Sequence, residues 1–197
     1  IFDVGHQSYV HKILTGRANE FHTLRKLNGI SGYISKDESV HDIWESGHSS
    51  TSISAQAGLI SAMEATNTNG RVISLIGDSS IANGIAFEGL NYLGQYQDKN
   101  PIIILNDNNM SISENVGGMN KYLNKIRTGD KYLGLKSTVS DTLLKVLPEK
   151  GTSVVKGIRH FKNAIKHFVI PGTWFEELGL TYLGPVDGND LHTVLSL

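Results

Sequence analysis

Apolar and polar residues are distributed along the first two-thirds of the chain in a pattern that predicts helices and strands in turn. Two continuous apolar runs, residues 72–76 and 101–105, have the length typical of strands buried in a parallel sheet. Helical patterns lie before and between these runs, at residues 49–65 and 81–96. A strand, a helix and a second strand form a βαβ unit, so the pattern predicts an α/β fold with a parallel sheet flanked by helices. The apolar side expected for the second helix consists of Ile81, Ile85, Leu90 and Leu93.

The N-terminal region and the last third of the chain give weaker signals. A short helical run at residues 9–14 ends near Gly16, and residues 17–46 show no regular period. Further on, apolar residues at helical spacing predict an amphipathic helix with a solvated basic face over residues 154–168. The last predicted elements are a helical turn at 175–178, a short strand at 180–183 and the start of a helix at 191–197.

The length of 197 residues suits one large domain or two small ones. Hydrophobic residues make up 39% and charged residues 19%, which is enough apolar material for a packed core. The first residue is Ile1 rather than Met, and no signal or transit peptide is visible. We therefore expect a fragment of a longer protein; the alternative is a small natural domain with trimmed ends.

Charge and cysteine content narrow the range of functions. Lys+Arg number 18 and Asp+Glu 19, and the formal net charge of −1 argues against nucleic-acid partners and against a polybasic membrane-binding surface. The sequence has no cysteine, so a disulfide framework, a zinc–thiolate site and a cysteine nucleophile are excluded. No apolar run approaches the roughly 20 residues that cross a bilayer, so we expect no membrane partner. A local phosphate-binding site is compatible with this charge balance.

Polar residues follow the two predicted strands where each strand ends. Asp78 comes directly after the first strand, and residues 106–109 after the second are Asn, Asp, Asn and Asn. Ligands of open parallel sheets bind at the carboxyl ends of the strands, so both loops can reach one ligand. A carboxylate beside a bound phosphate needs a cation between them, and Mg²⁺ prefers such oxygen ligands. The plainer alternatives are a helix-capping Asp and an Asn-rich turn.

Two further loops carry residues suited to the same site. Residues 47–52 place glycine, histidine and hydroxyl side chains at a helix start expected at Ser49 or Ser50, where N–H and O–H donors can bind phosphate. His6 follows a strand-like beginning and can transfer a proton or donate to a substrate. Simple helix capping and a structural histidine are the respective alternatives. The four polar loops together predict a site for a diphosphate and a divalent cation.

The loops that contain Asp78 and Asn108 resemble the thiamine diphosphate motif, in which Gly-Asp-Gly is followed further along the chain by Asn. Longer stretches resemble the 1-deoxy-D-xylulose-5-phosphate synthase family, in order and spacing, over essentially the whole chain. These stretches are DVGHQSY at 3–9, HKILTGR at 11–17, GHSSTSIS at 47–54, MSISENVG at 110–117, FEELG at 175–179 and GPVDG at 184–188.

The resemblance implies a thiamine diphosphate-binding fold and a transferase that depends on thiamine diphosphate and Mg²⁺. Such enzymes join pyruvate to D-glyceraldehyde 3-phosphate with loss of carbon dioxide, and their product feeds isoprenoid, thiamine and pyridoxal synthesis. Residues 1–197 would form most of an N-terminal domain that binds diphosphate and metal, with residues 120–170 as a mobile helical insertion and later domains outside this chain. A homodimer is also implied, in the cytoplasm of a bacterium or in a plastid of a eukaryote.

Two of the loops are assigned to metal and diphosphate by this resemblance. Asp78 and the side chain of Asn108 would bind Mg²⁺, with the Met110 carbonyl as a third ligand, and Asn108 would also contact the cofactor. Ser79 and Ser80 would meet the diphosphate through backbone N–H groups. The family has glycine where Ser79 stands, so Ser79 costs energy if that position needs a positive φ or a close backbone approach, although its hydroxyl could add a phosphate contact.

The remaining assignments surround the cofactor's rings and the reacting carbon. Gly47, His48 and Ser49 would line the cofactor site, and Ile112 would pack near the rings. His6 would contact the cofactor and act as the catalytic residue, by assisting proton transfer or orienting the substrate. The glutamate that activates thiamine lies in a later domain in this family, so we expect this chain alone to be inactive. Two alternatives stay open: another thiamine diphosphate enzyme of the transketolase type, and a degenerate, non-catalytic binding domain.

Overall fold

The computed structural model of the chain describes residues 1–108, 117–127 and 173–197. These residues belong to two compact units, Ile1–Asn120 and Lys121–Leu197. Several predictions lie outside the described residues, namely Met110, Ile112, the helix at 154–168 and most of the insertion at 120–170.

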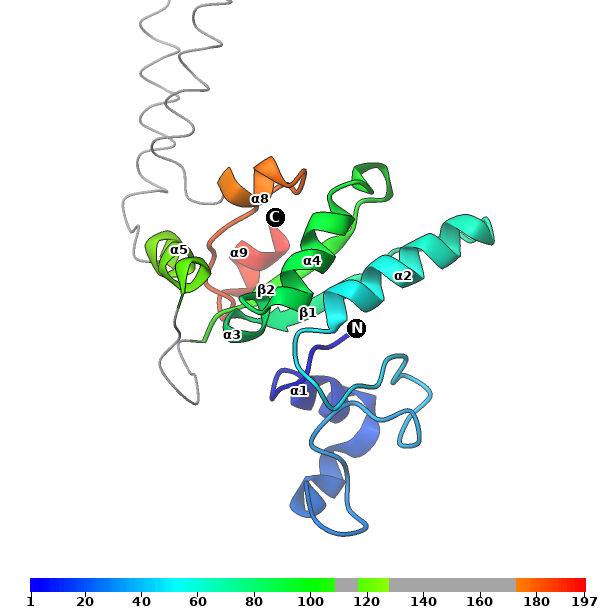
Figure 1. Ribbon diagram of the computed structural model, residues 1–197. Coiled ribbons are helices and arrows are strands. Elements are labelled where there is room, and N and C mark those ends of the chain that lie inside the picture. The colour runs from blue at the N-terminus through cyan, green and yellow to red at the C-terminus, as the bar shows by residue number, and fades with distance from the viewer. Residues whose placement is uncertain (109–116, 128–172) are drawn as a thin grey trace, which may run out of the picture. The chain divides into compact units, whose positions relative to one another are not determined.

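Three parallel segments of the first unit end at the same edge of a small sheet. β1 (Ile73–Gly77) pairs in parallel with β2 (Ile102–Asn106), within one residue of the two predicted strands. On the other side of β1, Phe2 forms an isolated parallel bridge with Leu75, whose N–H and carbonyl both bond to this N-terminal segment, at 2.9 and 2.8 Å. The predicted α/β fold with a parallel sheet is confirmed for these elements (Figure 1).

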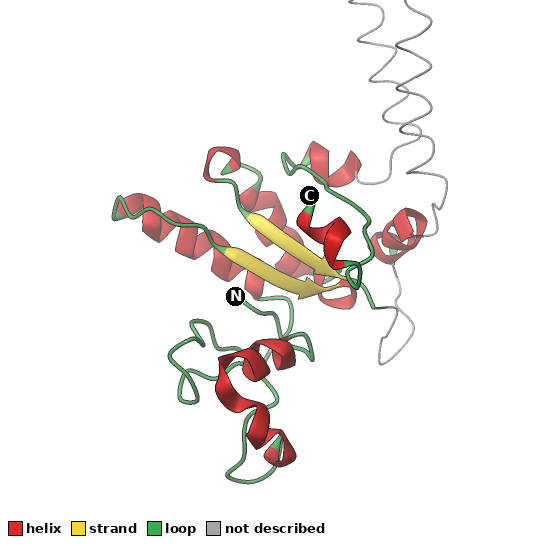
Figure 2. Ribbon diagram, turned by 180° about the vertical axis from the view of Figure 1, so that it is seen from behind, coloured by secondary structure: helices red, strands yellow, loops and turns green. Residues whose placement is uncertain are grey.

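Helices α2 (Ser52–Ala65) and α4 (Gly84–Leu93) cover one face of this sheet. Figure 2 shows the strands from the opposite side, in front of both helices. A single 3-10 turn, η3 (Gln97–Lys99), connects α4 toward β2. Apolar side chains buried in these helices and in β1 are Ile53, Ala57, Ile60, Ile76, Ala86, Leu90 and Leu93. Their burial supplies the main stabilisation of the layer between helices and sheet.

A buried amide ties α2 to both strands. The side-chain nitrogen of Gln56 donates to the carbonyls of Val72 (2.7 Å) and Ile102 (3.0 Å), at the beginnings of β1 and β2. Its side-chain oxygen accepts a bond of 2.7 Å from the hydroxyl of Ser74. Each polar atom of this fully buried side chain therefore has a partner, which fixes the helix along the sheet.

The helix predicted over residues 81–96 is interrupted near its beginning. Ile81 ends a separate short helix, α3 (Asp78–Ile81), and α4 begins only after Asn83. Asn83 has an extended backbone (φ −83°, ψ 151°), so the helical phase changes between α3 and α4. The prediction that Ile85 shares the apolar side is therefore wrong, because Ile85 is 57% exposed whereas Ile81 is 1% exposed.

The helical run predicted near the N-terminus is confirmed. α1 (Ser8–Lys12) continues into η1 (Ile13–Arg17), in which Gly16 has a φ of 99°. A short 3-10 helix, η2 (Ala18–Thr23), lies where the sequence shows no regular period. From there to α2 the backbone contains no helix or strand, in agreement with the irregular stretch expected up to residue 46.

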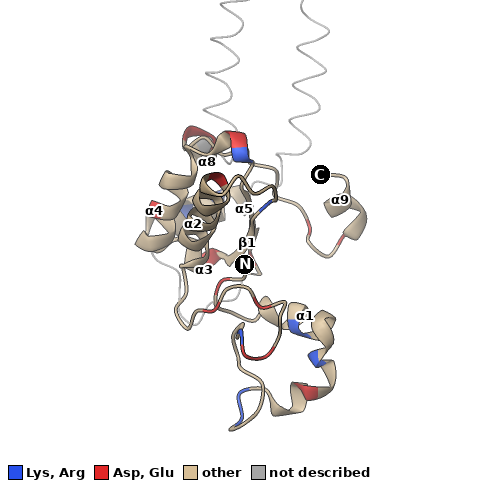
Figure 3. Ribbon diagram, turned by 90° about the vertical axis from the view of Figure 1, so that its right-hand side faces the viewer, with Lys and Arg blue, Asp and Glu red and all other residues tan. Residues whose placement is uncertain are grey.

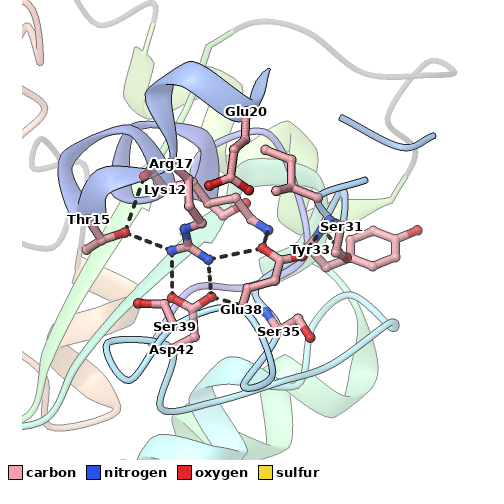
Figure 4. Close-up of polar contacts among 12 residues, drawn as sticks. Lys12, Thr15, Arg17, Glu20, Ser31, Tyr33, Ser35, Glu38, Ser39 and Asp42 are labelled. Atoms are coloured by element: carbon pink, nitrogen blue, oxygen red, sulfur yellow. Dashed lines mark hydrogen bonds and ion pairs between the residues drawn. The ribbon is translucent and has the colours of Figure 1, made fainter. Parts of the chain in front are cut away.

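Buried ion pairs hold this irregular stretch against α1 and η1. Arg17, 4% exposed, donates from both terminal nitrogens to Asp42 (2.6 and 2.9 Å) and from Nη1 to Glu38 at 3.1 Å. Lys12, fully buried, donates to Glu38 at 2.6 Å, and Nε2 of His11 lies 2.9 Å from Asp42. Figure 4 shows Glu38 between Lys12 and Arg17, and Asp42 paired with Arg17, so the loop and the helix share one polar cluster.

Burial and hydrogen bonding act in opposite directions on these groups. Burial raises the pKa of Glu38, but the hydrogen bonds from Lys12 and a backbone N–H outweigh it, so the pKa lies below its ordinary value. Burial likewise opposes the ionisation of Asp42, yet hydrogen bonds and charge, foremost from Arg17, leave the pKa of Asp42 lowered. The hydrogen bond to Asp42 raises the pKa of Arg17. Acidic and basic residues are interleaved around α1, as Figure 3 shows.

The described part of the second unit is built around aromatic side chains. α8 (Thr173–Glu177) confirms the helical turn predicted at 175–178. Phe175 of α8, 5% exposed, stacks on Tyr182 with ring centroids 5.5 Å apart and planes 9° from parallel. The backbone N–H of Trp174 donates to the hydroxyl of Tyr122 at 3.1 Å. Tyr122 belongs to α5 (Gly118–Arg127), which crosses the boundary between the units.

Two predictions for the end of the chain have opposite outcomes. The strand predicted at 180–183 is wrong, because these residues pair with no strand among the described residues and Tyr182 packs on α8 instead. α9 (Leu191–Leu195) begins where the sequence predicts a helix, and the carboxylate of Asp190 accepts two N–H groups of its first turn. No helix among the described residues is long and apolar enough to cross a membrane.

Candidate functional site

The carboxyl ends of the three parallel segments bring predicted site residues to one edge of the sheet. Gly77 lies opposite Asn106 in the register of β1 and β2, so Asp78 and Asn108 follow neighbouring strand ends. His6 follows the N-terminal segment that bridges to β1 on its other side. The topology therefore collects three of the four predicted polar loops around the end of β1.

A direct contact between two of the predicted residues joins His6 to Asn108. The side-chain nitrogen of Asn108 lies 2.7 Å from Nε2 of His6, although the two residues are 102 positions apart. The amide nitrogen is a donor, so Nε2 of His6 accepts and its lone pair faces Asn108. The other atom of the amide is a carbonyl oxygen, the type of ligand that Mg²⁺ prefers. The side chain of Asn108 can thus donate to His6 through its nitrogen and bind a cation through its oxygen.

Asp78, Ser79 and Ser80 form the beginning of α3, directly after β1. All three residues are half-buried, and Gly77 before them is extended (φ −79°, ψ 158°). N–H groups in the first turn of a helix have no partner within the helix, and an anion is favourable beside them. The backbone here is consistent with the diphosphate contacts expected of Ser79 and Ser80.

The backbone at Ser79 needs no glycine. Non-glycine residues with positive φ in the described part of the chain are Arg25, Asn28, Ser50, Asn67 and Asn100. Ser79 is not among them and lies in a right-handed helix, so serine fits this conformation without strain. A positive φ therefore does not penalise serine here. The other cost considered above, a close approach of the ligand to the backbone, is not removed by this observation.

The loop of Gly47, His48 and Ser49 is exposed and precedes α2. The predicted local capping of this helix is wrong: α2 begins at Ser52, and Thr51 before it makes no side-chain capping bond. The cap comes instead from a residue 49 positions before Ser52, which no local pattern indicates.

That residue is Asp3, which is 2% exposed. Its carboxylate accepts the N–H of Ser50 at 2.8 Å and the N–H of Ser52 at 3.1 Å. The segment that leads to His6 therefore also caps α2. The sequence shows only an acidic residue in a strand-like beginning. The N–H groups that it caps can be identified only from the tertiary structure.

The donors at this edge fit a magnesium ion shared with a diphosphate better than a metal held by protein alone. Asp78 offers carboxylate oxygens and Asn108 an amide oxygen, from neighbouring strand ends. Among the described residues no group of three or more His, Cys, Asp or Glu side chains could hold a metal ion. Mg²⁺ is commonly held by one or two protein carboxylates together with phosphate oxygens and water, so this small donor set is compatible with it.

The fold and the loops define an α/β domain that presents polar residues for a ligand at the carboxyl end of a parallel sheet. Residues 1–197 match the protein family described as 1-deoxy-D-xylulose-5-phosphate synthase. The chain therefore belongs to the 1-deoxy-D-xylulose-5-phosphate synthase family, as the sequence motifs predict.

Curated relatives agree with this assignment. The chain is 53% identical over 194 residues to 1-deoxy-D-xylulose-5-phosphate synthase of Alkaliphilus oremlandii. This alignment covers 98% of the chain and 31% of the relative. The synthases of Lachnoclostridium phytofermentans (47% identity) and Caldanaerobacter subterraneus subsp. tengcongensis (48%) each align with 100% of the chain and 31% of their own length. The chain thus spans about a third of these relatives. All three come from bacteria, which lends no support to the plastid alternative.

Proposed function

We propose that the protein carrying this chain condenses pyruvate with D-glyceraldehyde 3-phosphate, releasing carbon dioxide and forming 1-deoxy-D-xylulose 5-phosphate. Thiamine diphosphate and Mg²⁺ are its cofactors, and residues 1–197 are most of the N-terminal domain, with a thiamine diphosphate-binding fold. Family membership supports this reaction over a transketolase-type reaction. The observation that most supports the proposed active site is the 2.7 Å contact between His6 and Asn108. It joins a candidate proton-transfer group to a candidate metal ligand.

The metal end of the site consists of residues after β1 and β2. Asp78 and the side-chain oxygen of Asn108 hold Mg²⁺, with the carbonyl of Met110 as the third protein ligand. Ser79 and Ser80 direct backbone N–H groups of α3 toward the diphosphate. Their position at the end of β1, beside the end of β2, supports this division of roles.

The reactive end of the site involves His6 and the loop of Gly47, His48 and Ser49. Bound thiamine diphosphate supplies a nucleophilic carbon and an electron sink for the decarboxylation. Nε2 of His6 accepts a hydrogen bond from Asn108, so a neutral His6 carries its proton at Nδ1 and can donate that proton to the substrate. Asn108 would thereby orient the histidine and would offer its side-chain oxygen to Mg²⁺. The exposed loop lines the cofactor, and Ile112 packs near the cofactor's rings.

We further propose that the enzyme is a homodimer and acts in the bacterial cytoplasm, as the family resemblance implies. The isolated chain is expected to be inactive, because it spans only 31% of the relative from Alkaliphilus oremlandii and no glutamate in it can be assigned to the activation of thiamine. Activity therefore has to be measured on a protein of full family length that includes this chain.

The test combines turnover with cofactor titration. A protein of full family length should form the pentulose phosphate and release carbon dioxide only when pyruvate, D-glyceraldehyde 3-phosphate, thiamine diphosphate and Mg²⁺ are all present. Residues 1–197 alone serve as the matched control and should turn over nothing. Binding of thiamine diphosphate without turnover would favour another reaction, and failure to bind it at all would favour a degenerate domain.

A further inference from the structure

Asp3 is a buried acid without a charged partner. Its residue is 2% exposed, and among the described residues no Lys, Arg or His forms an ion pair with it. The carboxylate is instead satisfied by the N–H groups of Ser50 and Ser52. Its backbone is also fixed, because its N–H donates to Leu75 (2.8 Å) and its carbonyl accepts from Gln7 (2.9 Å). Asp3 therefore holds the start of α2 at a set position beside β1.

Ser50 extends this contact to a third loop. Its hydroxyl accepts a bond of 2.7 Å from the side-chain nitrogen of Asn83, the residue between α3 and α4. Asp3, Ser50 and Asn83 thus form one polar chain, which we name the loop tie. The loop tie joins the segment that leads to His6, the loop that ends in Ser50, and the segment that carries Asp78.

Helix capping alone does not account for this arrangement. A local Ser, Thr or Asp at the helix start satisfies the same N–H groups without burying a distant carboxylate. Ser50 also adopts a φ of 74°, which costs a non-glycine residue about 1 kcal/mol or more. Such strain persists where surrounding contacts over-determine a conformation, and it is concentrated at functional sites. Here the strained residue directly follows the exposed loop of Gly47, His48 and Ser49.

We infer that Asp3 is a positioning residue that, through the loop tie, sets the Gly47–Ser49 loop relative to His6 and Asp78 before the cofactor binds. This inference rests on the proposed function, because the three loops are taken to hold thiamine diphosphate and Mg²⁺. Asp3 touches neither of them in this arrangement; it acts by keeping exposed loops in one geometry. A loop already held in its binding geometry loses less conformational freedom when the ligand arrives.

The test compares Asp3→Asn with Ile60→Ala in a protein of full family length. Asparagine keeps the shape of the side chain and one acceptor, but it turns an N–H group toward one of the two backbone donors. Ile60 is a buried residue of α2, two turns from the loop tie, so its replacement destabilises the same helix without touching the network. Asn83→Ala removes the exposed end of the tie and leaves the buried carboxylate intact.

Two measurements separate positioning from stability. Hydrogen exchange of residues 46–53 without cofactor should accelerate in Asp3→Asn and less so in Asn83→Ala, but not in Ile60→Ala. Titration with thiamine diphosphate at fixed Mg²⁺ should show a Kd raised about tenfold for Asp3→Asn and about threefold for Asn83→Ala, but within about twofold of wild type for Ile60→Ala.

The outcomes are distinguishable from failure of the proposed function. A wild-type protein that binds no thiamine diphosphate refutes the function, and the exchange measurement still decides whether Asp3 orders the loop. Unchanged exchange in Asp3→Asn overturns the inference. Equal loss of affinity in Asp3→Asn and Ile60→Ala also overturns it, because stability alone would then explain the effect.

Discussion

Replacing Arg17 with methionine removes the guanidinium that joins Glu38 and Asp42 but keeps a long side chain in its place. The side chain of Arg17 is 5% exposed and that of Asp42 fully buried, so the change leaves a carboxylate without its main cation. Breaking a buried ion pair from one side costs about 3–5 kcal/mol. Asp42 retains bonds from His11 (2.9 Å) and the Ser35 N–H (3.3 Å), so we expect a loss near the lower end, about 3 kcal/mol.

The assay is hydrogen exchange of the segment that Glu38 and Asp42 anchor, which reports the free energy of its local opening. Lys99→Met is the matched control: Lys99 forms ion pairs at 3.4 Å with Glu64 and Asp98, but it is 38% exposed and should change nothing measurable. The double variant Arg17→Met with Asp42→Leu removes both charges and should cost less than the sum of the two single variants. The reasoning is refuted if Arg17→Met behaves like Lys99→Met, or if the double variant is additive.

The same cluster predicts a dependence of stability on pH. The pKa of Glu38 and that of Asp42 are both lowered in the folded chain, so folding favours their ionised forms. Their contribution is fully present above the ordinary pKa values of about 4, and it is lost as the pH falls through the lower folded values. The free energy of opening of this segment should therefore be constant near neutral pH and fall below about pH 4. In Arg17→Met this free energy should depend less on pH.

Four further variants test helix packing and the proposed cofactor site. Gly89→Ala places a Cβ 3.0 Å from the side chain of Ile53 and from the backbone nitrogen and hydroxyl of Ser54, so the free energy of unfolding should fall by about 1–3 kcal/mol. A Cβ at Gly58 meets nothing within 4 Å, so Gly58→Ala should stabilise by about 0.5–1 kcal/mol. Equal effects in denaturant titrations would contradict this view of helix packing. Asp78→Ala should abolish Mg²⁺-dependent binding of thiamine diphosphate in a calorimetric titration, and near-normal affinity would remove Asp78 from the metal site. Ser79→Gly should leave that affinity within about twofold or weaken it, because the serine is unstrained; a large gain would reveal a close backbone approach to the ligand.

Local sequence signals predicted the elements of the sheet layer well. The runs at 72–76 and 101–105 became β1 and β2 with a shift of one residue, because continuous β-branched and apolar residues have few other environments that suit them. The order of strand, helix and strand then dictated the parallel pairing and placed Asp78 and Asn108 at one edge. His6 reached the same edge because the chain's first residues bridge to β1.

Two of the errors share one physical cause, namely contacts between residues that are distant in sequence. Capping of α2 was predicted from neighbouring hydroxyl groups, but a carboxylate from Asp3 took that role. The exposed position of Ile85 follows from the extended backbone at Asn83, which also contacts Ser50 in another loop. A period of apolar residues carries no information about such partners, so neither result could be read from the local pattern.

The function proposed for this sheet edge requires exposed polar groups that meet the ligand and buried polar groups that hold them in place. The loop of Gly47, His48 and Ser49 and the side chain of His6 are exposed, as the ligand contacts proposed for them require. Exposed loops supply few contacts of their own and open easily, so their geometry must come from elsewhere. Asp3 can supply it because a fully satisfied carboxylate in a buried position is costly to displace. A motif search finds the first group of residues, because their chemistry is recognisable, but only the folded chain reveals the second.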